Sequence, residues 1–275
     1  MSEQHRTRRR STRPGRVRAS LVSVTCLLRG LPLLFCAAPR TPLRVLGIIA
    51  LDTLHVLRYS QPLSRKTISD LALFLDLAGY ANAAWDDKSP CAKEYLAIRC
   101  RLEAAGLGSR IEGYLGRLQE LESGRPSIAS DRQRFDEVRS YREAVARLSL
   151  ATAADIAFDA RRREKSDGGV RASLCDADVD TLFRILMQCQ IIDDILDYTE
   201  DVSASLPSFL TAASFPQALE LTARAAHSYA GEPERSSGDV VFPLRLALRA
   251  FAMATTLVVH IAYRRHRTTR QFAHR

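Results

Sequence analysis

The chain is a succession of helical segments separated by short breakers. From Thr41 onward, apolar residues recur three and four positions apart, which is the spacing of a helix with one buried face. Segments rich in Gly, Pro and Ser interrupt this pattern, and no alternating apolar–polar run bounded by hairpin turns occurs. With 46% apolar residues the chain can bury a full core, so we predict an all-α bundle. The predicted helices are 42–58, 66–86, 90–105, 109–123, 131–163, 176–202, 215–230 and 240–264.

The net charge of +9 is concentrated at the two ends of the chain. Residues 1–18 contain seven Arg and one Glu, and residues 264–275 contain five Arg and no acid. The stretch between them is therefore slightly negative, which argues against a nucleic-acid-binding fold. We predict a basic, disordered leader over 1–40, a single all-α domain over 41–264 and a basic tail over 265–275. The two ends either are solvated or contact an anionic surface.

Two hydrophobic segments bear on localisation. Residues 19–38 resemble a signal sequence, but Arg29 and Pro32 interrupt the apolar run. A basic, acid-poor transit peptide or a wrongly chosen start codon would look similar. Residues 240–263 read either as a terminal core helix or as a helix resting on a membrane surface. The six cysteines form no CxxC pair, so we expect a reduced, cytoplasmic protein, with membrane association left open. The oligomeric state stays open between monomer and homodimer.

The stretch QIIDDILDYTED, Gln190 to Asp201, holds five carboxylates among isoleucine, leucine and tyrosine. On a continuous helix, four aspartates share an arc of about 100° and the isoleucines lie on the opposite side. Like charges at i,i+4 destabilise a helix, and Asp is a poor residue inside one. The alternative is an ordinary solvated acidic face. The residues on the arc are Gln190, Asp193, Asp194, Asp197 and Asp201.

No Lys or Arg lies between Arg184 and Arg224, so nearby sequence supplies no cation for these aspartates. Short carboxylates one turn apart suit a hard divalent ion. Mg²⁺ takes one or two carboxylates and fills its other positions with water and phosphate oxygens. We therefore predict that Mg²⁺, rather than a side chain, neutralises the cluster.

QIIDDILDYTED resembles the second aspartate-rich motif of trans-polyprenyl diphosphate synthases, Q-x-x-D-D-x-x-D-Y. It is also similar to the squalene/phytoene synthase pattern, whose D-x-x-x-D pair falls on Asp197 and Asp201. The following SLPSFLTA is similar to a shortened K-P-T-L-P-L-L-x-A segment. The resemblance implies the class I terpenoid synthase fold, an all-α bundle around a central apolar cavity. It also implies Mg²⁺-dependent chemistry on a prenyl diphosphate.

Such enzymes carry a second acidic cluster that faces the first. The candidate here is LDLAGYANAAWDDK, in which Asp86 and Asp87 match D-D-x-x-D but the third aspartate is missing, and Asn82 lies beside them. A helix ending in a solvated Asp-Asp is the alternative. The resemblance then implies metal binding by both clusters, with Asp193, Asp197 and Asp86 as the catalytic residues. The candidates for binding the diphosphate substrate are Arg58, Arg65, Lys66, Arg142, Arg147, Gln190 and Tyr198.

The chain departs from both families. It has no G-G-K-R-x-R-P-like segment, and Leu196 replaces the usual Arg of squalene/phytoene synthases. The expected activity is ionisation of an allylic prenyl diphosphate and coupling to a second isoprenoid unit. Two alternatives stay open: a non-catalytic prenyl-lipid-binding or regulatory subunit of the same fold, and a membrane-associated helical scaffold. No specific nucleic-acid partner is expected.

Overall fold

The computed structural model describes residues 16–30, 32, 42–85, 92–127, 133–163, 177–231 and 240–273. These residues contain ten helices and no strand, which confirms the all-α prediction. The helices are α1 (Arg16–Gly30), α2 (Pro42–Tyr59), α3 (Arg65–Trp85), α4 (Ala92–Ala104), α5 (Gly108–Ser123), α6 (Gln133–Arg163), α7 (Ala177–Leu196), α8 (Tyr198–Ser203), α9 (Phe215–Ala230) and α10 (Phe242–Ala273).

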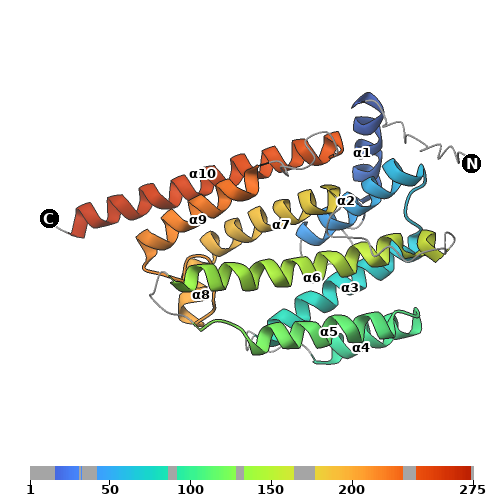
Figure 1. Ribbon diagram of the computed structural model, residues 1–275, viewed down its shortest axis with the longest axis horizontal. Helices are drawn as coiled ribbons and strands as arrows, with labels where there is room; N and C mark the ends of the chain where they lie inside the picture. The colour runs from blue at the N-terminus through green and yellow to red at the C-terminus, as the bar shows by residue number, and fades with distance from the viewer. Residues whose placement is uncertain are drawn as a thin grey trace, which may run out of the picture.

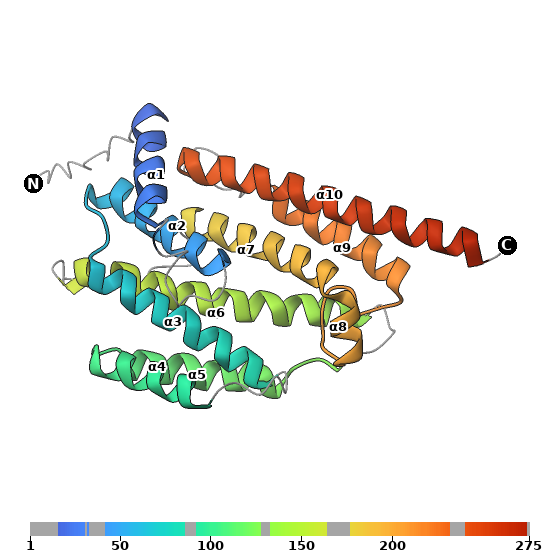
Figure 2. The same ribbon diagram turned by 180° about the vertical axis from the view of Figure 1, so that it is seen from behind.

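The long helices lie roughly along one direction, in successive layers (Figures 1 and 2). α4 and α5 form one edge of the bundle, and α10 with α9 forms the other. α6 and α7 run through the middle and pack against each other. α1 stands across this direction, beside the N-terminal end of α10, and contacts both α2 and α10.

Apolar clusters hold the helices together, and the two largest both include residues of α6 and α7. The larger joins α2, α3, α5 and α6 and includes Phe74 and Tyr114, whose rings meet edge to face at 5.0 Å. The smaller joins α6, α7 and α9 and includes Phe183, Met187 and Phe209. Packing of these apolar faces holds α6 and α7 in place, and residues of both helices line the polar pocket described below.

The predicted helix 176–202 is interrupted. α7 ends at Leu196 and α8 begins at Tyr198, with Asp197 between them. The segment that follows folds back onto α7 and buries Phe209 and Leu210 completely. Ser205 adopts a positive φ of 54° at the start of this return. A helix continuing straight past Leu196 could not deliver these two apolar side chains to the core.

The two predicted basic ends also contain helix. α1 falls inside the stretch assigned to a leader: Cys26 is buried, and Arg29 forms an ion pair of 2.9 Å with the buried Asp52. α10 extends to Ala273 and so includes most of the predicted tail. Among the described residues, Pro243–His266 of α10 is the one stretch long and apolar enough to cross a membrane by length and composition.

Candidate functional site

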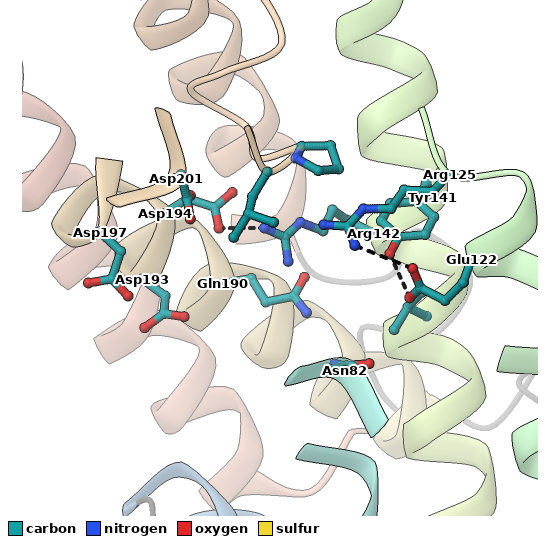
Figure 3. Close-up of a pocket in the computed structure, with 13 residues that line it drawn as sticks. Asn82, Glu122, Arg125, Tyr141, Arg142, Gln190, Asp193, Asp194, Asp197 and Asp201 are labelled. Atoms are coloured by element: carbon teal, nitrogen blue, oxygen red, sulfur yellow. Dashed lines mark hydrogen bonds and ion pairs between the residues drawn. The ribbon is translucent and has the colours of Figure 1, made fainter. Parts of the chain in front are cut away.

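A polar pocket of about 130 Å³ opens where the acidic end of α7 meets α3, α5 and α6 (Figure 3). Its wall is mainly charged and amide side chains, with a few apolar ones. The apolar cavity implied by the resemblance therefore stays a prediction. The lining residues are Asn82, Glu122, Arg125, Tyr141, Arg142, Val145, Gln190, Asp193, Asp194, Asp197, Asp201, Leu206 and Pro207.

The four aspartates are of two kinds, exposed and buried. Asp193 and Asp197 are exposed at the rim of the pocket, one helical turn apart. Asp194 and Asp201 are buried, with 4% and 7% of their surface exposed. All four still line one pocket, as the helical arc predicts, but only Asp193 and Asp197 present carboxylates to solvent.

Asp194 is built into the fold. One carboxylate oxygen accepts a hydrogen bond from Arg142 at 3.0 Å, and the other accepts the backbone N–H of Phe209 at 2.7 Å. The latter bond anchors the SLPSFLTA segment to α7. Burial raises the pKa of Asp194 to about 6, and Arg142 and the Phe209 N–H lower it only in part. The prediction that no side chain neutralises the cluster is wrong for Asp194, because α6 brings Arg142 from 52 residues earlier.

The opposite side of the pocket joins α5 and α6 through a second charged group. Tyr141 donates a hydrogen bond of 2.7 Å to the buried Glu122, and Arg125 approaches the other carboxylate oxygen at 3.6 Å. Burial and this hydrogen bond raise the pKa of Tyr141 above its ordinary range. Two guanidinium groups, those of Arg125 and Arg142, therefore border the pocket across from the exposed aspartates (Figure 3).

Two amide side chains complete the pocket. Gln190 lies between the aspartates and Glu122, and its buried Oε1 accepts no hydrogen bond from the described residues. Asn82, on the last turn of α3, lies across from it in Figure 3. Asp86 and Asp87 fall outside the described residues, but Asp86 directly follows Trp85, where α3 ends.

Three of the basic residues predicted to bind the diphosphate lie away from the pocket. Arg58 pairs with the buried Asp178 at 2.8 Å, and Lys66 pairs with Asp70 on its own helix at 2.6 Å. Arg65 begins α3. The rise of about 1.5 Å per residue puts Lys66 about 24 Å along the helix from Asn82. The structure therefore does not support a role in the pocket for these three.

Arg147 and Tyr198 also point elsewhere. Arg147 lies five residues after Arg142 on α6 and so faces a different side; its guanidinium stacks on the Phe183 ring at 3.7 Å. Tyr198 packs against Phe215, with ring centroids 4.4 Å apart. Of the seven predicted substrate-binding residues, the structure brings Arg142 and Gln190 to the pocket.

The sequence reasoning missed Glu122, Arg125 and Tyr141. A signal for Glu122 was present, because Ile111, Tyr114, Leu118 and Glu122 follow each other at spacings of three, four and four. They form the buried stripe of α5. A carboxylate at the end of an apolar stripe needs a buried partner. Nothing in the local sequence identifies Tyr141 as that partner.

The residues present suit a metal ion that arrives with its ligand. Among the described residues, no three His, Cys, Asp or Glu side chains form a group able to hold a metal ion. Asp193 and Asp197 offer two exposed carboxylates, as many as Mg²⁺ usually takes from a protein when phosphate oxygens and water supply the rest.

Comparison of the chain with protein-family models, with curated proteins and with solved structures finds no match in any of the three. The class that the structure defines is accordingly an all-α bundle with an acidic and arginine-lined pocket at the end of α7. The resemblance to isoprenoid synthases rests on the local motif.

Proposed function

We propose that this chain is a Mg²⁺-dependent prenyltransferase that ionises an allylic prenyl diphosphate and couples it to a second isoprenoid unit. One observation carries the proposal: Asn82 lines the same pocket as Asp193 and Asp197. The end of α3, which leads directly into Asp86 and Asp87, thus approaches the acidic end of α7. The isoprenoid-synthase motif requires this approach of two acidic segments.

Different residues of the pocket would bind the metal ion and the phosphate groups. Asp193 and Asp197 would hold Mg²⁺, which when bound withdraws charge from the leaving diphosphate. Arg142 and Arg125 would bind phosphate oxygens, since a guanidinium offers paired N–H donors that match them. The Gln190 side chain would add a neutral donor from its amide nitrogen. Acidic and basic groups around one cavity suit a metal-bound polyanion better than either ion alone.

Asp194 is a positioning residue in this scheme. Its ion pair holds the Arg142 guanidinium at the pocket, and its bond to the Phe209 N–H holds the SLPSFLTA segment in place. Phosphate binding by Arg142 therefore requires no rearrangement of the side chain.

A second candidate function is binding of a prenyl diphosphate without turnover. It is favoured by the burial of Asp194 and Asp201, which leaves two exposed aspartates on the α7 side. The missing third aspartate after Asp86 and Asp87 points the same way. A membrane-associated helical scaffold without a ligand site is the third alternative, and it leaves the composition of the pocket unexplained.

The test measures diphosphate release from a panel of allylic prenyl diphosphates, with and without Mg²⁺. Replacing Asp193 and Asp197 together by Ala should reduce release at least about 100-fold, since the electrostatic stabilisation of the leaving group is lost. The matched control, Glu112→Ala with Glu120→Ala, removes two exposed carboxylates from α5 and should leave release unchanged. Unchanged release in the aspartate variant contradicts the mechanism.

Binding can be followed separately through Trp85, the single tryptophan of the chain. Its carbonyl accepts a hydrogen bond of 3.5 Å from Arg125, so it lies at the border of the pocket. We expect Mg²⁺ with a prenyl diphosphate to change Trp85 fluorescence, and Arg142→Gln to weaken that response. Binding without release identifies the second candidate, and neither binding nor release identifies the third.

A further inference from the structure

The first helix carries an exposed apolar stripe that the bundle does not cover. Val17, Leu21, Val24 and Leu28 follow at i, i+4, i+7 and i+11, the spacing of one helix face. Their exposed fractions run from 54% to 75%. Cys26, on another face, is buried against the rest of the protein. The stripe is therefore an outward surface of a packed helix.

The last helix carries a second stripe of the same kind. Leu246, Met253, Leu257 and Ile261 recur along one face of α10 with exposed fractions from 41% to 74%. The opposite face packs on α7 and α9 and buries Leu248. Only 17% of the apolar stretch of α10 is buried. Most of this stretch could therefore contact a membrane or another molecule.

The two stripes belong to one edge of the molecule. α1 contacts α10, and in both views α10 forms the edge of the bundle opposite α4 and α5. α1 stands at the N-terminal end of α10 and extends beyond that edge (Figures 1 and 2). Two helices that carry large exposed apolar side chains, one near each end of the chain, therefore lie next to each other at this edge.

The charged residues of α1 and α10 have a single sign. Neither α1 nor α10 contains an Asp or Glu, whereas α10 alone contains six Arg. The sequence that precedes α1 is also basic, since residues 1–15 contain five Arg and one Glu. Exposed apolar stripes on helices whose charged residues are all basic are complementary to a bilayer with anionic headgroups.

We propose that the α1–α10 edge binds the surface of an anionic lipid membrane, with the two stripes in the interface and the Arg residues at the headgroups. α10 lies on the membrane and does not cross it, because its other face is part of the bundle. Thr255 is fully buried there and donates a hydrogen bond of 3.4 Å to the carbonyl of Gln188 on α7. A second copy is a poorer occupant of this edge, since pairing two such edges brings like charges together.

The experiment is sedimentation of the full chain with phosphatidylcholine vesicles and with vesicles that also contain phosphatidylserine. Binding should favour the anionic vesicles and weaken as salt is raised. Met253→Glu with Leu257→Glu places two acids in the α10 stripe and should weaken binding at least about tenfold; Leu21→Glu with Val24→Glu should do the same for α1. All four side chains are exposed, so far-UV circular dichroism should show an unchanged fold.

The matched control is Leu96→Glu with Ala97→Glu, which adds two acids to exposed positions of α4 at the opposite edge. It should bind vesicles as the unchanged chain does. Light scattering without lipid measures the oligomeric state and so tests whether a second copy of the chain covers this edge instead. The proposal is overturned if the stripe variants bind vesicles normally, or if the chain is a dimer that Met253→Glu with Leu257→Glu dissociates.

Discussion

Replacing Arg142 by leucine tests how much stability depends on its ion pair with Asp194. The Asp194 carboxyl is buried, and its pKa is raised from 3.8 to about 6 even with Arg142 3.0 Å away. Since each pKa unit corresponds to about 1.4 kcal/mol, ionising this group already costs the fold about 3 kcal/mol. Without Arg142 the pKa must rise further.

Protonation of Asp194 limits the stability that Arg142→Leu can remove. At a pH of about 7.5, a carboxyl whose pKa moves from about 6 to above the pH becomes protonated, so the electrostatic loss cannot exceed about 2 kcal/mol. The direction of the pH dependence of stability follows from the raised pKa of Asp194. A group that binds protons more tightly in the folded state stabilises the fold below its unfolded pKa, and this contribution disappears as the pH rises through about 6. The electrostatic cost of Arg142→Leu should therefore reach at most about 2 kcal/mol at pH about 7.5 and nearly vanish at about 5.

Urea unfolding followed by circular dichroism at the two pH values measures this difference. For a chain of this size, 2 kcal/mol corresponds to a melting temperature lower by about 5 °C. Adding Asp194→Asn to Arg142→Leu should remove the pH-dependent part, because an Asn oxygen can still accept the Phe209 N–H and carries no charge. Arg99→Leu breaks an exposed pair with Glu103 and is the control, with an expected cost below about 0.5 kcal/mol. An equal cost of Arg142→Leu at both pH values would refute the reasoning.

Two further predictions concern stability away from the pocket. Burial alone would raise the pKa of Glu143, but hydrogen bonds from Tyr229 and Arg139 outweigh it and lower the pKa below its ordinary 4.5. This group therefore stabilises the fold above that value and stops doing so as the pH falls; Glu143→Gln should flatten that part of a pH titration of unfolding free energy. Gly106 has a φ of 82° with open space around it, so Gly106→Ala should cost about 1 kcal/mol through the backbone alone. Gly113→Ala, inside α5 and equally open, should instead stabilise by about 0.5–1 kcal/mol in the same denaturation assay, and a gain at both sites would contradict the reasoning.

Much of the helix order follows from local sequence. The predicted segments 42–58, 66–86, 109–123 and 215–230 match α2, α3, α5 and α9 to within one residue at each end. Helical periodicity and breakers act over a few neighbouring residues, so a short window contains the information. α1 was missed because a basic, apolar N-terminal stretch reads as a targeting segment. Whether it packs depends on α2 and α10, which lie elsewhere in the chain.

The sequence by itself determined that the chain is helical and that aspartates gather with Gln190 on one side of α7. Only the tertiary structure decided what each aspartate does. The return of Phe209 to the core and the packing of α6 bury Asp194 against the Phe209 N–H and Arg142, while Asp193 and Asp197 stay exposed. The periodicity of a helix depends on residues within one or two turns. The burial and pairing of a carboxylate depend on which distant helices pack beside it, and local sequence does not carry that information.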